Sequence, residues 1–157
     1  MASKSHTATP DGYLSEGRRA RARAAVGARA FRYAGALALL AMGVIHLEQY
    51  ASGGYNNIPT IGTLFLLNFV GALVLSLALM SPIERLRPDL GRQLLVLLAL
   101  AGMAMAAASI VFLLISESTP LFGFRESGYH AAIVLALAAE GLAVLCLGAF
   151  AARQGAR

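Results

Sequence analysis

Charged residues are scarce in this sequence, making up only 13% of a 157-residue chain that is 58% hydrophobic. Soluble domains carry about 25% charged residues, so the polar side chains that would cover a water-facing surface are missing. The shortage excludes an intrinsically disordered chain and a soluble coiled coil. It favours lipid as the solvent of the folded chain.

Cysteine and tryptophan are also rare or absent. Cys146 is the only cysteine, so the chain can form no internal disulfide and contains no CxxC redox or zinc motif. Because the sequence has no tryptophan, an aromatic belt at a membrane surface would have to consist of tyrosine and phenylalanine.

The sequence does contain four long apolar segments, each of which predicts a membrane-spanning helix. They are Tyr33–Tyr50, Ile58–Met80, Gln93–Ile115 and Ala131–Ala152. The second and third have no charged residue over 23 positions each, more than the roughly 20 residues that a helical span needs. The first is the weakest, because its purely apolar part ends at Ile45. The predicted fold class is all-α, an integral membrane four-helix bundle.

The distribution of positive charge supports four crossings with both termini cytoplasmic. Seven Lys and Arg residues precede the first segment, three lie between the second and third, and two follow the fourth. Only Arg125 would face outward, which is the asymmetry that the positive-inside rule describes. The predicted location is the bacterial inner (cell) membrane, with the lipid bilayer as the first partner.

The basic N-terminal region divides the chain into three predicted parts. Residues 1–30 form a cytoplasmic segment, flexible or interfacial, residues 31–152 form the transmembrane domain, and residues 153–157 form a short cytoplasmic tail. We interpret the arginines as an orientation signal that rests on anionic lipid head groups. A cleaved signal peptide is disfavoured because His46 and Glu48 interrupt the place where a cleavage site should follow. A nucleic-acid-binding arm is disfavoured because no folded nucleic-acid-binding domain accompanies it.

Polar residues within apolar spans are costly and need partners, so they are the candidate functional residues. Glu140 lies about 15 Å into the fourth segment, near the midplane, and Asn68 lies about 12 Å into the second. We expect Glu140 to bond to Asn68, or to a serine such as Ser109. This contact would either tie the helices together or form a proton site.

A second set of polar residues is predicted at the outer face. Its members are His46, Glu126, Tyr129 and His130. We expect the headgroup region to hydrate the two histidines. Two alternatives are a haem site with His46 and His130 as axial ligands, and a metal site formed by His46, Glu126 and His130. The spacing lacks the specificity of a zinc motif, and we expect no bound metal or cofactor.

Three stretches of the sequence resemble uncharacterised small four-span integral membrane proteins of high-GC bacteria. The stretches are GVIHL at 43–47, IPTIGTLFLLN at 58–68 and FGFRESGYHAAI at 122–133, the last leading into Glu140. The resemblance extends over about residues 33–152 and implies the four-span topology. It implies no activity.

The functional hypothesis is a small integral membrane protein that is a non-enzymatic accessory or subunit protein. No nucleophile–base constellation or cofactor motif indicates an enzyme. A homo-oligomer or a larger membrane complex is the expected assembly, and nucleic acid is not an expected partner. The alternative is a small proton-coupled transporter that uses Glu140.

The topology is testable by cysteine labelling in intact cells. In a Cys146→Ala background, we expect single cysteines at Asn56 and Ser118 to react with an impermeant maleimide. Cysteines at Arg18 and Asp89 should stay unlabelled, because the positive-inside rule places them in the cytoplasm. Labelling of Arg18 and Asp89 from different sides would refute four crossings.

Overall fold

The computed structural model describes residues 10–85, 87–125, 128 and 130–155, with the backbone alone at 10–15 and 20. Its elements are α1 (Pro10–Ala51), η1 (Tyr55–Asn57), α2 (Pro59–Met80), η2 (Ile83–Arg85), α3 (Pro88–Ser118) and α4 (Ala131–Gly155). The described residues form helices and connectors without a strand, which confirms the all-α prediction. The four long helices are each long and apolar enough to cross a membrane.

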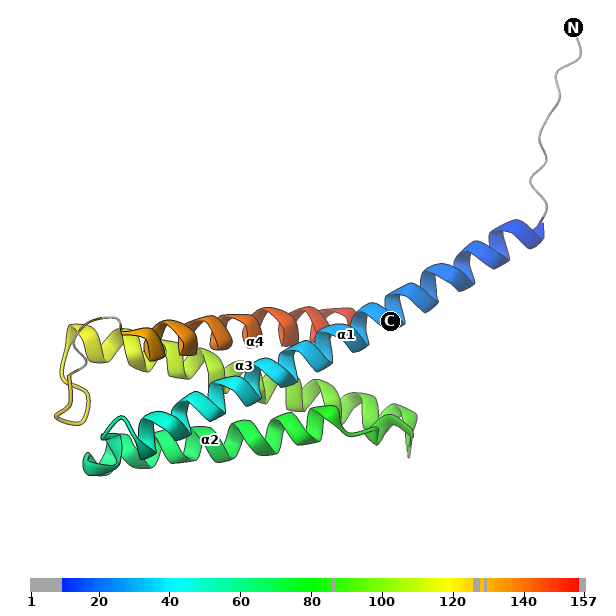
Figure 1. The fold of residues 1–157 in the computed structure, drawn as a ribbon. Coiled ribbons are helices and arrows are strands. Elements are labelled where there is room, and N and C mark those ends of the chain that lie inside the picture. Colours follow the sequence, from blue (N-terminus) through cyan, green and yellow to red (C-terminus); the bar gives the residue numbers. More distant parts are fainter. Residues whose placement is uncertain (1–9, 86, 126–127, 129, 156–157) are drawn as a thin grey trace, which may run out of the picture.

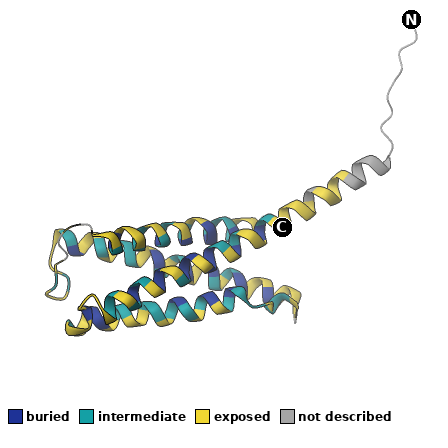
Figure 2. Cartoon of the chain, in the orientation of Figure 1, coloured by how far each residue is buried: buried dark blue, intermediate teal, exposed yellow. Residues whose placement is uncertain are grey.

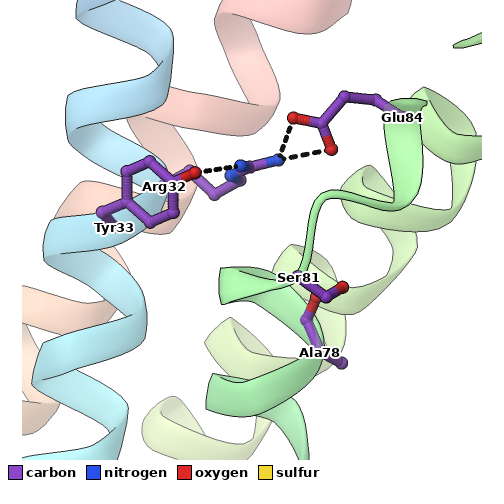
Figure 3. Close-up of polar contacts among 5 residues, drawn as sticks. All are labelled: Arg32, Tyr33, Ala78, Ser81 and Glu84. Atoms are coloured by element: carbon purple, nitrogen blue, oxygen red, sulfur yellow. Dashed lines mark hydrogen bonds and ion pairs between the residues drawn. The ribbon is translucent and has the colours of Figure 1, made fainter.

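Proline and serine residues set where helices begin and end. Pro59 and Pro88 stand in the first turns of α2 and α3, where the backbone N–H that proline lacks has no helical partner anyway. At the other end of α2, the Ser81 hydroxyl donates to the carbonyl oxygen of Ala78 at 2.6 Å (Figure 3). This bond satisfies one of the carbonyls left open at a helix end.

Helix α1 runs diagonally across the bundle, and its C-terminal half lies against α2 and α4 (Figure 1). Helix α4 also packs on α3, whereas α1 and α3 barely touch. The connectors that follow α1 and α3 lie at one end of the bundle (Figure 1). The connector between α2 and α3, the end of α4 and the projecting N-terminal half of α1 lie at the other (Figure 1). The first end is the predicted outer end.

Small residues let α1 approach its neighbours closely. A Cβ atom at Gly43 would lie 2.8 Å from the Cβ of Ala72 on α2, and one at Gly35 would lie 2.5 Å from Leu147 on α4. Both distances are below van der Waals contact, so any larger residue would push the helices apart. These crossings hold α1 between α2 and α4, and that position carries His46 into the interior.

Many positions along the four helices are exposed (Figure 2), and large apolar side chains occupy many of them. Leu67, Leu97 and Leu145 are each more than 60% exposed. A helix that is apolar on every face is typical of a membrane span or of a helix buried in a larger protein. The outer surface of this bundle is therefore suited to contact lipid or other apolar helices.

A buried arginine ties the middle of α1 to η2 (Figure 3). Arg32, only 2% exposed, donates to both carboxylate oxygens of Glu84 at 3.0 Å. Its guanidinium also donates to the Tyr33 hydroxyl at 2.8 Å and lies 4.7 Å from the centre of that ring. These contacts give the buried charge a counterion and three hydrogen bonds, which offset part of the cost of its removal from water.

The Arg32–Glu84 contact should contribute measurably to stability. We expect Glu84→Ala to lower the free energy of unfolding by about 2 kcal/mol, because the hydrogen bonds are charge-assisted and Arg32 would be left buried without a counterion. Arg92→Ala is the control, since the Arg92–Asp89 pair is exposed and 4.0 Å apart and should contribute little. Unfolding in mixed micelles, followed by circular dichroism, measures both. Equal effects would contradict the structural role of Arg32.

Candidate functional site

Four polar side chains, one from each long helix, meet inside the bundle. We call His46 of α1, Asn68 of α2, Ser109 of α3 and Glu140 of α4 the polar cluster. His46 and Glu140 are 7% and 2% exposed. Asn68, Ser109 and Glu140 each lie nine residues from the outer end of their helix, a depth of about 14 Å. They therefore share one level of the bundle.

The ring of His46 is oriented by its own helix. Its Nδ1 lies 2.9 Å from the carbonyl oxygen of Met42. A carbonyl oxygen only accepts hydrogen bonds, so Nδ1 carries the hydrogen. In the neutral ring Nε2 is then an acceptor, and it faces Asn68 Nδ2 and Ser109 Oγ, each at 3.2 Å.

The orientation of His46 fixes the orientation of the Asn68 amide. If the amide were flipped, its oxygen would face the Nε2 lone pair, and two acceptors would oppose each other. With Nδ2 on this side, Asn68 donates to His46 and also to Ser109 Oγ at 3.3 Å. Its Oδ1 is then buried without a hydrogen-bond partner in the described structure.

Glu140 completes the cluster from α4. Its Oε1 lies 3.9 Å from His46 Nε2, which is too long for a hydrogen bond. Ser109, whose Oγ lies 3.2 Å from the same Nε2, is also a neighbour of the Glu140 carboxyl group. The carboxyl group therefore stands beside both the imidazole and the Ser109 hydroxyl.

A cavity of about 340 Å³ adjoins the polar cluster and is lined by all four cluster residues. Most of its lining is apolar, including Phe65, Phe112 and Leu113. Leu121 and Phe124, from the connector between α3 and α4, also contribute to the lining. The cavity thus extends from the cluster towards the predicted outer end of the bundle.

An aromatic stack joins the outer connectors to the cluster. Phe65 lies against His46 with ring centres 5.0 Å apart, and Tyr55 stacks on Phe65 at 4.5 Å. Phe124 meets the Tyr55 ring edge-on at 5.6 Å. Gly62 makes room for η1, since a Cβ there would lie 2.6 Å from the Tyr55 carbonyl oxygen. The stack covers one side of His46 with aromatic surface.

The structure places the predicted polar residues differently from the expectation. His46 is buried beside Glu140 instead of being hydrated at the headgroup level, because the outer connectors fold over it. Glu140 and Asn68 belong to one cluster, but Ser109 and His46 stand between them. His130 is exposed and lines the cavity. Glu126 and Tyr129 lie outside the described residues.

Among the described residues, no group of three or more His, Cys, Asp or Glu side chains could hold a metal ion. Glu126, one of the three proposed ligands, lies outside them. The cluster itself presents one imidazole and one carboxyl group, with an amide and a hydroxyl between them. These four side chains are better suited to form hydrogen bonds than to coordinate a metal ion.

The contact between Ser109 Oγ and His46 Nε2 has the distance of a nucleophile–base pair, which the sequence did not indicate. Other features argue against hydrolysis. Ser109 lies within α3, so the neighbouring backbone N–H groups bond within the helix and cannot form an oxyanion hole. The carboxyl group of Glu140 stands on the Nε2 side, whereas a catalytic acid orients the ring from Nδ1.

Comparisons with protein-family models, curated proteins and solved structures found no match to this chain. Inference about function therefore depends on the geometry of the cluster and the cavity.

We predict that Ser109 is not a reactive nucleophile. A fluorophosphonate probe should fail to modify Ser109 in the purified protein, because the hydroxyl lacks an oxyanion hole and is engaged by the cluster. Mass spectrometry of the peptide that contains Ser109 is the measurement. Modification that disappears in both Ser109→Ala and His46→Gln would instead establish a catalytic dyad.

Proposed function

We propose that this chain is an integral protein of the bacterial cell membrane that crosses the bilayer four times, with both termini in the cytoplasm. The proposal is supported by four helices of sufficient length and apolarity. It is also supported by the concentration of arginine at the end of the bundle where the chain begins and ends. Its apolar outer faces fit a lipid environment.

We further propose that the protein is a non-enzymatic accessory or subunit protein. The observation that carries this proposal is the polar cluster, in which Asn68 hydrogen-bonds His46 and Ser109 on other helices and Glu140 lies beside His46. These contacts bring all four long helices together and leave none of the four cluster side chains arranged as an activated nucleophile. The exposed leucines of α2, α3 and α4 would contact lipid, a second copy or a larger membrane complex.

A proton-coupled transporter is the second candidate, and one contact favours it. Glu140 Oε1 and His46 Nε2 are 3.9 Å apart, and Ser109 Oγ lies 3.2 Å from the same Nε2. A hydroxyl between a carboxyl group and an imidazole can accept a proton from one and donate its own to the other. The three side chains could therefore relay a proton between two helices.

Glu140→Gln distinguishes these two candidates. Glutamine keeps the hydrogen-bonding capacity but cannot exchange a proton, and interhelical bonds in membranes average about 0.6 kcal/mol. We therefore expect the variant to fold with nearly unchanged stability and, if the protein is an accessory subunit, to keep the same assembly. Crosslinking in native membranes measures the assembly, and pyranine-loaded proteoliposomes under an imposed potential measure proton movement.

The exposed Glu48 provides the matched control as Glu48→Gln. Under the accessory proposal, the wild type and both variants move no protons in proteoliposomes. Proton movement that is present in the wild type and in Glu48→Gln but lost in Glu140→Gln would reject the accessory proposal in favour of the transporter.

A further inference from the structure

We propose that the cavity beside the polar cluster binds one small, mostly apolar molecule whose head group donates hydrogen bonds to the cluster. This inference rests on the proposed non-enzymatic function and names the ligand class of the same site. At about 340 Å³, the cavity lies near the lower limit of ligand pockets, which span roughly 300 to 1,000 Å³. A compact molecule fits this space, and a two-chain phospholipid does not.

The residues that line the cavity favour a ligand whose larger part is apolar. Phe65, Phe112 and Phe124 contribute aromatic surface, and most of the other lining residues are aliphatic. Polar side chains outside the cluster, such as Gln49, Ser116 and His130, are a minority of the lining. A ligand with an aromatic or branched hydrocarbon body would make dispersion contacts with the lining side chains, which lack these contacts when the cavity is empty.

The head group follows from the acceptors that the polar cluster leaves open. Asn68 Nδ2 lies 3.2 Å from His46 Nε2 and 3.3 Å from Ser109 Oγ, so the amide nitrogen is engaged within the cluster. Asn68 Oδ1, in contrast, has no hydrogen-bond partner among the described residues. The carboxyl oxygens of Glu140 can also accept hydrogen bonds.

A ligand that donates hydrogen bonds would therefore complete the cluster, whereas one that only accepts would not. Asn68 and Glu140 both line the cavity, so a single head group can be near both. A neutral hydroxyl and an ammonium group share this donor chemistry. They differ in charge, and the experiment separates them.

The test uses full-length protein in detergent micelles and a phenol that bears a trifluoromethyl diazirine as a photolabel. We expect saturable labelling that maps to peptides lining the cavity and is displaced by 4-propylphenol. Its methyl ether, 4-propylanisole, keeps the body and the oxygen but cannot donate. It should need about tenfold higher concentration to compete, which corresponds to the loss of one hydrogen bond to the site.

Two alanines of α4 provide matched variants. Ala136 lines the cavity, whereas Ala138 is exposed and does not line it. Ala136→Phe should fill the cavity and reduce displaceable labelling about tenfold, whereas Ala138→Phe should leave it unchanged. Ala108→Phe, which enters the cavity from α3, repeats the test if Ala136→Phe does not fold.

The competitor 4-propylbenzylamine distinguishes the two head groups. Competition stronger than that of 4-propylphenol, lost in Glu140→Gln, supports the proposal with a cationic head group. Equal or weaker competition supports it with a neutral one. The proposal is overturned if 4-propylanisole competes as well as 4-propylphenol, if labelling does not saturate, or if Ala136→Phe and Ala138→Phe behave alike.

Failure of this proposal is distinguishable from failure of the proposed function. Labelling in micelles reports on the cavity, whereas cysteine accessibility and crosslinking in membranes report on topology and assembly. If the protein crosses the membrane four times but its cavity is not labelled, the proposed function stands and only the ligand proposal fails.

Discussion

The hydrogen bond between His46 Nδ1 and the Met42 carbonyl oxygen determines the arrangement of the whole polar interior. It leaves Nε2 as the acceptor that faces the other three helices. Asn68 must then present its amide nitrogen, and Ser109 Oγ and Glu140 Oε1 both lie beside Nε2. Because water is the usual alternative partner of such groups and the surroundings are apolar, each side chain depends on the others. A change in the imidazole would therefore be transmitted to all four helices.

This arrangement requires that α1 reach the interior. Gly43, one turn before His46, permits contact with Ala72 on α2, and Gly35 permits contact with Leu147 on α4. The same helix is also held near its middle by the contact of Arg32 with Glu84. The position of α1 is therefore set both by its steric fit against α2 and α4 and by two sets of polar contacts, those of the polar cluster and the Arg32–Glu84 pair. The position of His46 follows from both.

The sequence predicted α2, α3 and α4 well, because long uncharged runs and proline or serine boundaries are local signals. It missed the first half of α1, which begins at Pro10 and not near Tyr33, because the arginines end the apolar run without ending the helix. It also identified Asn68 and Glu140 as polar residues at similar depth. It could not place His46 correctly, since counting residues along a helix ignores the connectors that cover its end. Ser109 was named only as one alternative, although its distance from the end of α3 equals that of Glu140 from the start of α4. The aromatic stack on Tyr55 depends on contacts between distant segments, for which the sequence has no local signal.

The contact between Arg32 and Glu84 has a further consequence for biosynthesis. The two residues are 52 positions apart, and synthesis proceeds from the N-terminus. In the proposed topology, α1 enters the membrane before α2 has crossed, so at that stage Arg32 carries its charge without the Glu84 contact, beside the arginines before it. In the proposed orientation, it helps to retain the N-terminus in the cytoplasm at this stage. Once α2 has crossed and η2 has formed, the carboxylate neutralises it. One side chain therefore serves first in orienting the nascent chain and later in closing the folded bundle.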